Sequence, residues 1–234
     1  MITLYSFGPN LNVADPSPFV LKTNLLLKVS TLPFETVSGA KYLQKAPKGK
    51  LPYIEDKGKT VSDSFFIEKY LQEEYNFDIN AHLTSEQRAI SDLVCSGLEE
   101  RFYWCIVHFR WMFESNWAVI NPTFFGDMPF PLNKIIPKIA KKDVKKAMHG
   151  HGIGRHTEAE ILQIADAQLQ AISELLNDKH YFFNDKLSLL DICSYAMLAQ
   201  ILLPDMPSPL VDLTKQYSNL VEFCERINTS FYDK

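Results

Sequence analysis

The signals for β-strands in this chain are confined to its first third, which limits the folds it can adopt. Four short stretches have the alternation or the β-branched and aromatic content of strands, namely residues 2–7, 34–37, 51–55 and 60–62. A helix is predicted from Ser17, with Pro18 at its first position, and another from Ser64. The tight turn at 56–58 joins the last two strands into a hairpin. The predicted order is therefore β-α-β, a loop, and then β-β-α.

Only helical patterns remain beyond the polar linker 78–83. Three residue pairs have the spacing of a capping box before an apolar-periodic run: Thr84 with Gln87, Thr157 with Glu160, and Ser188 with Asp191. Helices are predicted from these pairs to about residues 113, 176 and 203, and a last one over 211–227. Proline and glycine residues within 115–133 predict irregular structure there. We therefore predict a small α/β domain over residues 1–77 and an all-α domain over residues 84–234.

The composition narrows the range of functions and locations. Of the 234 residues, 46% are hydrophobic and 22% are charged, which is typical of a folded protein, and the net charge of −4 gives no electrostatic reason to expect nucleic acid as a partner. The first residues show no basic region followed by a long apolar stretch. The apolar run 187–203 is interrupted by Asp191 and Gln200. We therefore expect a cytoplasmic protein without an integral membrane segment.

The cysteines and histidines do not have the spacing of disulfide or metal sites. The four cysteines form no Cys-x-x-Cys pair and lie scattered in apolar helical segments, at Cys95, Cys105, Cys193 and Cys224. Buried reduced thiols are the interpretation we favour over disulfides or metal ligands. Glycines separate His149, His151 and His156, and no thiol or carboxylate completes a ligand set. We expect a glycine-rich loop there and no metal.

A run of lysines at helical spacing precedes these histidines in the chain. They are Lys134, Lys138, Lys141, Lys142, Lys145 and Lys146. A solvated helix face is the interpretation we favour. Contact with acidic lipid or with a partner protein is the alternative.

Several of these features resemble a known family. The strand and helix order, a Leu-Pro that enters the third strand, Asp63-Ser64 before the next helix, and the Ser188-x-x-Asp191 box together resemble the glutathione S-transferase superfamily. Residues 17–22, 47–55 and 150–156 resemble, more narrowly, its failed-axon-connections and metaxin-like branch. The resemblance covers nearly the whole chain. It implies a thioredoxin-like N-terminal domain, an all-helical C-terminal domain, glutathione as co-substrate and a homodimer.

The same resemblance suggests how glutathione is held. A serine hydroxyl and the free N–H groups at a helix start suit the γ-glutamyl carboxylate, and a nearby carboxylate suits the ammonium group, so Ser64 and Asp63 are candidates. The alternative is that they only cap their helix. In the family the Leu-Pro bond is cis, which implies that Leu51, before Pro52, offers its backbone to the tripeptide.

The candidate for the glycyl carboxylate of glutathione lies in the turn before the third strand. Lys50 and Lys48 are both long enough to reach such a group. The alternative is that these lysines are solvated turn residues.

Ser17 is the candidate for activating the glutathione thiol. The family keeps a Ser, Tyr or Cys near the start of the first helix, directed at the sulfur. A hydrogen bond to a charged group is worth about 1.5–3 kcal/mol, enough to lower a thiol pKa by roughly 1–2. Ser17 is also a good helix cap without any chemistry, and Tyr5 is a second, weaker candidate. The absence of a cysteine at position 17 argues against thioltransferase activity.

The aromatic residues of the long helix after residue 84 suggest a second pocket. Most of them are expected in the core. Tyr103, Trp104 and Trp111 are the candidates for an apolar wall that receives a small hydrophobic electrophile.

Together these features predict an enzyme that binds reduced glutathione and adds its thiolate to a small apolar electrophile. The alternative is a protein that kept the fold and lost the chemistry, and acts as a binding or adaptor protein.

Overall fold

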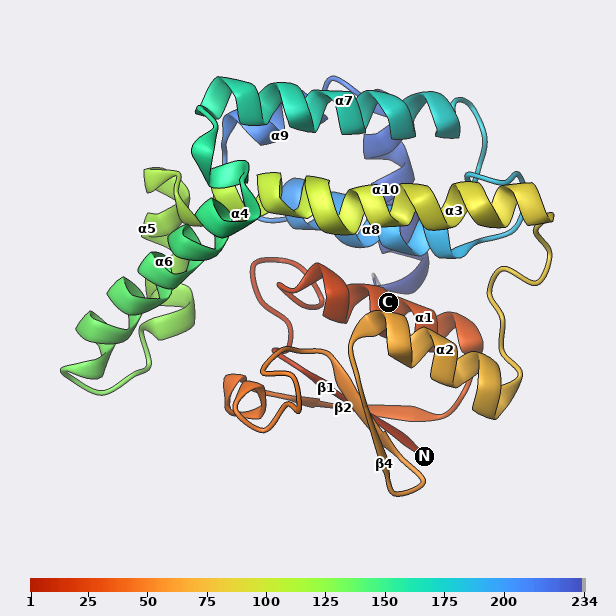
Figure 1. Ribbon diagram of the computed structural model, residues 1–234, viewed down its shortest axis with the longest axis horizontal. Helices are drawn as coiled ribbons and strands as arrows, with labels where there is room; N and C mark the ends of the chain where they lie inside the picture. Colours follow the sequence, from red (N-terminus) through yellow and green to blue (C-terminus); the bar gives the residue numbers. More distant parts are fainter. Residues whose placement is uncertain (233–234) are drawn as a thin grey trace.

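The computed structural model describes residues 1–232 and has a four-stranded sheet at one end and a larger helical part at the other (Figure 1). The strands are β1 (Ile2–Ser6), β2 (Phe34–Ser38), β3 (Tyr53–Asp56) and β4 (Lys59–Ser62). Their order in the sheet is β2-β1-β3-β4, with β1 and β2 parallel and the other neighbours antiparallel. This arrangement, followed by helices only, confirms the predicted thioredoxin-like domain and helical domain.

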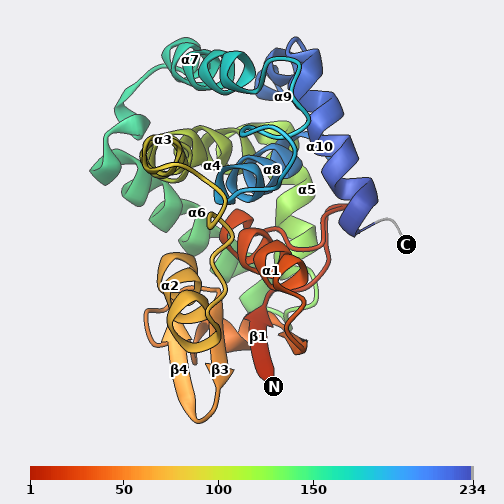
Figure 2. The ribbon, with the colours of Figure 1, turned by 90° about the vertical axis from the view of Figure 1, so that its right-hand side faces the viewer.

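Two helices link the sheet to the rest of the molecule. α1 (Pro18–Ser30) and α2 (Ser64–Tyr75) lie between the sheet and the C-terminal helices, as both views show (Figures 1 and 2). Strand β1 alternates buried and partly buried residues, and its buried Ile2 and Leu4 belong to the same core as residues of α1 and α8. Because one continuous core serves both parts, burial of apolar surface holds them together.

The helical part is built around one buried helix. In chain order its α-helices are α3 (Ser85–Gly97), α4 (Tyr103–Trp111), α5 (Glu114–Phe125), α6 (Leu132–His151), α7 (Glu158–Leu176), α8 (Leu189–Leu202), α9 (Pro209–Thr214) and α10 (Ser218–Phe231). Helix α8 is apolar all round and buried along almost its whole length. It packs against α1, α3 and α10, which explains why its sequence lacks the two-faced pattern of a surface helix.

All three predicted capping boxes are confirmed, at the starts of α3, α7 and α8. The third is fully buried: Asp191 accepts hydrogen bonds from the Ser188 N–H, the Ser188 hydroxyl and the Phe182 N–H. Burial raises the pKa of Asp191 to about 6, and these donors limit the rise. The box therefore fixes both the start of the central helix and the loop before it.

The structure differs from the predicted secondary structure in four places. The single last helix predicted over 211–227 is two helices, α9 and α10, separated by residues 215–217. The helix predicted to run from 84 to about 113 is divided by a π-helical turn, Leu98–Phe102, into α3 and α4. Residues 114–125 form helix α5 although Pro122 lies within it, and irregular structure is limited to the residues that follow. Helix α6 continues through His151, so two of the three histidines lie on a helix and not in a loop.

The four cysteines are buried and free, as predicted. Among residues 1–232, the helices all fall short of the length and hydropathy that crossing a membrane requires.

Candidate functional site

Ser17 caps helix α1 and keeps its proton available. Its Oγ accepts a hydrogen bond from the Val20 N–H at 3.4 Å, and its backbone is extended, as a cap requires. Within residues 1–232, no acceptor lies in hydrogen-bond contact with the Ser17 hydroxyl. A hydroxyl has one donor and two acceptor positions, so capping and donation to a ligand are compatible. The start of α1 adds a partial positive charge beside this group.

Asp15 holds the loop that carries Ser17. Its Oδ1 accepts from the Ser17 N–H, and its Oδ2 accepts from the N–H groups of Phe7 and Gly8, all at 2.9 Å. The side chain is 2% exposed. Burial raises the pKa of Asp15 to about 7, and the three N–H donors and the Arg110 guanidinium limit the rise. One carboxylate thus joins the end of β1 to the start of α1.

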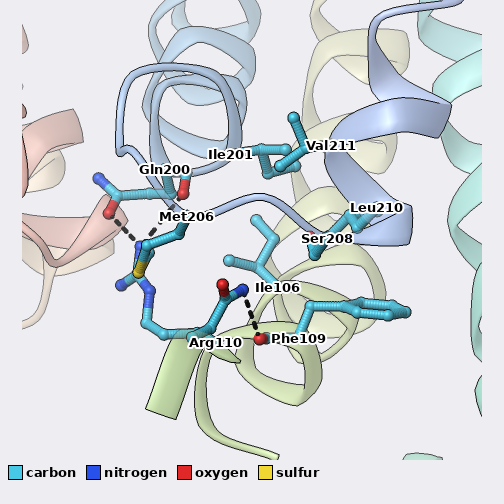
Figure 3. Close-up of a pocket in the computed structure, with 10 residues that line it drawn as sticks. Ile106, Phe109, Arg110, Gln200, Ile201, Met206, Ser208, Leu210 and Val211 are labelled. Atoms are coloured by element: carbon cyan, nitrogen blue, oxygen red, sulfur yellow. Dashed lines mark hydrogen bonds between the residues drawn. The ribbon is translucent and has the colours of Figure 1, made fainter. Parts of the chain in front are cut away.

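The helical part fixes this loop from the other side, through the Arg110 and Gln200 side chains that Figure 3 draws. Arg110, on α4, donates to the Pro16 carbonyl at 2.6 Å and to the side-chain oxygen of Gln200 on α8 at 2.7 Å. Gln200 in turn donates to the Asp15 carbonyl at 3.0 Å. Burial lowers the pKa of Arg110 to about 10, which leaves the guanidinium charged at neutral pH. Ser17 is therefore positioned by residues of both domains.

The space beside Arg110 and Gln200 is not a substrate pocket. The cavity there has a volume of about 20 Å³ and is lined mainly by apolar residues of α4, α8 and α9 (Figure 3). Such a volume holds about one water molecule, whereas ligand pockets usually measure about 300–1,000 Å³.

The Leu51–Pro52 peptide bond is cis, and this turn packs against the start of α1. Leu51 shares a small buried cluster with Val20, the residue whose N–H bonds to Ser17. Among the described residues, no backbone hydrogen bond joins the N–H or the carbonyl of Leu51, which leaves both groups available to an extended peptide. The Pro52 carbonyl accepts from the Asp63 N–H at 3.2 Å, which connects this turn to the start of α2.

Asp63 and Ser64 begin helix α2. Asp63 has a φ of 87° and caps the helix through its Oδ1, which accepts from the Phe65 N–H at 3.1 Å. Such a backbone conformation is unusual for a residue other than glycine and indicates a constrained turn. Ser64 is buried, and its hydroxyl has no hydrogen-bond partner within residues 1–232. A helix start with an unused hydroxyl suits a carboxylate ligand.

The remaining polar candidates differ in whether their side chains already interact with another residue. Lys50 is exposed and unpaired among the described residues, while the Nζ of Lys48 lies 4.1 Å from the ring centre of Phe66. The hydroxyl of Tyr5 donates to Glu55 at 2.7 Å. This hydrogen bond, with some burial, raises the pKa of Tyr5 to about 12. The Tyr5 hydroxyl thus already donates its proton to Glu55. This favours Ser17 as the hydrogen-bond donor to the glutathione thiolate.

The three aromatic candidates for the second pocket lie in two groups: the ring centres of Tyr103 and Trp104 are 5.5 Å apart, and Trp111 packs elsewhere. Tyr103 packs edge-on against Phe19 of α1, with ring centres 5.0 Å apart. Trp104 stacks on His151 at the end of α6, at 4.8 Å. Trp111 lies 5.7 Å from Trp117 of α5. Tyr103 therefore faces the N-terminal domain, whereas the two tryptophans contact the helices α5 and α6.

Sequence reasoning missed Asp15, Arg110 and Gln200. A signal for two of them was present, because Arg110 is a charged residue in an aromatic helix and Gln200 interrupts an apolar one. A polar residue in a buried helix needs a partner, and here the partner is the loop of the candidate site.

Comparison with known proteins identifies the family of the chain. The family model described as the glutathione S-transferase N-terminal domain matches residues 18–116, and that of the C-terminal domain matches residues 165–227. An isoprene-epoxide–glutathione S-transferase of Rhodococcus sp. (strain AD45) is 30% identical over 238 residues, covering 99% of both chains. The chain belongs to the glutathione S-transferase family.

Two other relatives of this glutathione S-transferase family member are not named as transferases. The failed axon connections protein of Drosophila melanogaster is 30% identical over 240 residues, but the match spans 57% of that longer protein. Human metaxin-2 is 26% identical over 215 residues, which cover 91% of this chain and 81% of metaxin-2. Among solved structures, the β-etherase LigF of Sphingobium sp. strain SYK-6 has a TM-score of 0.66 at 21% identity, covering 97% of this chain and 94% of that one.

Proposed function

We propose that this glutathione S-transferase family member binds reduced glutathione and transfers its thiolate to a small apolar electrophile, with the Ser17 hydroxyl donating a hydrogen bond that stabilises the thiolate. The observation that carries the proposal is the Ser17 hydroxyl, which has a free proton at a helix start and is fixed by Asp15. In the reaction the glutathione sulfur loses its proton to solvent and forms a bond to an electrophilic carbon. The bond from that carbon to its leaving group, or to an epoxide oxygen that is then protonated, breaks.

Three features of the N-terminal domain, together with one solved relative, support glutathione as the ligand. The free N–H and carbonyl of Leu51, beside the cis Pro52, suit an extended tripeptide backbone. The hydroxyl of Ser64 at the start of α2 suits the γ-glutamyl carboxylate, and Asp63 suits the ammonium group. A glutathione transferase of Ceriporiopsis subvermispora, solved in complex with glutathione, has the same fold, with a TM-score of 0.60 at 20% identity. Lys50 is exposed and is our candidate for the glycyl carboxylate.

The electrophile is proposed on two grounds. Tyr103 lies against α1, on the side of α4 that faces the candidate site, and offers an apolar surface there. The Rhodococcus relative is named for an isoprene epoxide, which is a small apolar electrophile. An epoxide of that size is therefore the substrate class that we would test first.

The decisive experiment compares Ser17→Ala with a matched cap variant, Thr157→Ala. Both changes remove an N-cap side chain, from α1 and from α7, and each costs about 1 kcal/mol of stability. We expect Ser17→Ala alone to raise the pKa of bound glutathione, measured by thiolate absorbance, and to lower kcat about 10- to 100-fold. Equal activity of the two variants, in a preparation that conjugates glutathione, would show that Ser17 only caps its helix.

A binding protein without conjugation activity is the second candidate. It is favoured by the fact that the Val20 contact accounts for Ser17 without any chemistry, and by relatives whose names are not those of transferases. Calorimetric titration separates the two: glutathione binding without turnover of any epoxide would support the second candidate, and turnover would exclude it.

We also propose that the chain is a cytoplasmic homodimer. Phe65 and Phe66 on α2 are 46% and 52% exposed, and Leu93 on α3 is 73% exposed, which is more apolar surface than a helix face in water usually shows. Light scattering during size-exclusion chromatography tests this, since a monomer at micromolar concentration would contradict it.

A further inference from the structure

Helices α5 and α6 form a hairpin that projects from the helical domain at the left-hand end of Figure 1. The turn between them, residues 126–131, lies at the outer end of this hairpin. Its Phe130 side chain is 83% exposed, and Leu132, Ile135 and Ile139 of α6 are 46%, 47% and 49% exposed. Large apolar side chains that gather on one exposed segment usually mark an interaction surface.

The exposed apolar residues of α6 lie on one side of the helix, opposite its buried side. At about 100° a residue, Leu132, Ile135 and Ile139 fall within about 60° of one another, and the buried Pro137 and Met148 fall about 180° away from them. A surface helix needs one apolar stripe, which faces the core. Helix α6 has a second stripe that faces away from the core, so packing within residues 1–232 does not account for it.

The same helix carries a large positive charge. Six lysines and one aspartate give α6 a formal charge of +5, so the remainder of the chain, whose total is −4, carries −9. Lys142 and Lys146 continue the exposed apolar stripe at spacings of three and four residues. Lys141 pairs with Glu114 at 3.1 Å, and within residues 1–232 the other five lysines of α6 form no ion pair. Exposed apolar and cationic side chains therefore share one surface.

An anionic lipid surface fits this combination better than a nucleic acid or an acidic protein. A nucleic acid backbone offers negative charge but no apolar layer that would cover four exposed apolar side chains. A protein partner needs a complementary shape, whereas this surface is the end of a projecting hairpin (Figure 1). A bilayer adapts to such a shape: apolar side chains enter the headgroup boundary by about 5–10 Å, and lysines extend to the lipid headgroups. The negative remainder of the chain is repelled by the same surface, which orients the hairpin towards it.

We propose that the α5–α6 hairpin binds the surface of an anionic phospholipid membrane. Phe130, Leu132, Ile135 and Ile139 enter the headgroup region, and the lysines of α6 bind the acidic headgroups. The helix lies along the membrane surface and does not cross it. This surface shares no residue with the candidate glutathione site, so membrane binding is independent of the function proposed for Ser17.

Flotation of the purified protein with phospholipid vesicles tests this proposal. Vesicles of phosphatidylcholine alone are compared with vesicles that also contain about 30% phosphatidylserine, at about 0.1 M and about 0.5 M salt. We expect saturable binding to the vesicles with phosphatidylserine only. The binding should weaken severalfold at the higher salt, because salt screens exposed charges.

A pair of lysine substitutions measures the contribution of charge. Lys142→Ala/Lys146→Ala should lower the partition coefficient about 25-fold, at about fivefold for each lysine near the lipid. Lys186→Ala/Lys215→Ala is the matched control, because it removes the same charge from exposed positions outside the hairpin. The control should stay within about twofold of wild type.

A second pair of substitutions measures the apolar contribution. Phe130→Ser/Ile135→Ser leaves the charge unchanged and should lower the partition coefficient about tenfold. Leu43→Ser, at an exposed leucine of the N-terminal domain, should leave it within about twofold. All these positions are exposed, and circular dichroism checks that each variant keeps the helix content of the wild type.

Three results would overturn the proposal. They are equal binding to both kinds of vesicle, equal weakening by Lys142→Ala/Lys146→Ala and its control, and no binding to either kind of vesicle. The last result would leave an acidic protein as the partner of this surface. Since none of these measurements needs conjugation activity, failure of this proposal is distinguishable from failure of the function proposed for Ser17.

Discussion

Replacing Asp15 by Asn tests how the loop of the candidate site is held. The carboxylate accepts three backbone hydrogen bonds, from Phe7, Gly8 and Ser17. An asparagine has one oxygen, so its NH₂ group must face at least one of these N–H donors. An unsatisfied buried donor costs about 1–3 kcal/mol, and this cost is nearly independent of pH.

The free energy of unfolding of the wild type, in contrast, depends on pH, because Asp15 itself titrates. Burial raises the pKa of Asp15 from 3.8 to about 7 in the folded state. Between these values the folded protein keeps a proton that the unfolded chain has released, so stability falls as the pH rises. A change of about 3 in pKa corresponds to about 4 kcal/mol at 1.36 kcal/mol each, as an upper bound. Asparagine does not titrate, so Asp15→Asn loses this dependence.

Urea unfolding followed by circular dichroism, from pH 4.5 to 8, measures both effects. The quantity of interest is the free energy of unfolding of the wild type minus that of Asp15→Asn, because the raised pKa of Asp191 affects both proteins equally and cancels. We expect this difference to be positive near pH 4.5 and to fall by up to about 3 kcal/mol by pH 8, because part of the full change has already occurred below pH 4.5. A difference that stays constant within about 0.5 kcal/mol, or that rises with pH, would refute the argument.

Three further predictions concern the rest of the fold. Lys22 of α1 is buried and forms an ion pair with the partly buried Glu99, so Lys22→Met should lower the free energy of unfolding by about 3 kcal/mol, and adding Glu99→Gln should restore part of it, as a double-mutant cycle in urea will measure. Asp191→Ala leaves three buried donors without an acceptor and should lower Tm by roughly 6–12 °C for a loss of about 3 kcal/mol, whereas a change below 2 °C would contradict the role of the box. Burial raises the pKa of Cys105 and Cys224 to about 12, so these thiols should react with Ellman's reagent at pH 8 only after urea is added.

The sequence was sufficient for those features that depend on local pattern. Strand alternation, the Pro18 start of α1 and the three capping boxes each involve residues within a few positions of one another, and the structure has all of them. The division of the long helix was not predictable in this way. The π-helical turn Leu98–Phe102 contains ordinary helix formers, and the residues on both sides of it pack against different neighbours.

The candidate site was predictable only in part, for the same reason. Ser17, Pro52 and Asp63 lie at recognisable starts and turns. Arg110 and Gln200 act on the loop across sequence separations of 94 and 185 residues, and no local pattern records such a contact. Helix α5 was missed because a proline is expected to end a helix, whereas Pro122 is accommodated within this one.

The hydrogen bonds of Arg110 and Gln200 to the loop limit how this fold can be recombined. The carbonyl groups of Asp15 and Pro16 belong to the first domain, but their donors belong to the second. A chimaera that joins residues 1–77 of this chain to the helical domain of a relative would leave both carbonyl groups unpaired unless that relative has the same two donors. Exchange of domains within the family therefore requires compatible residues at these two helix positions. The conformation of the loop in the first domain depends on side chains that the second domain supplies.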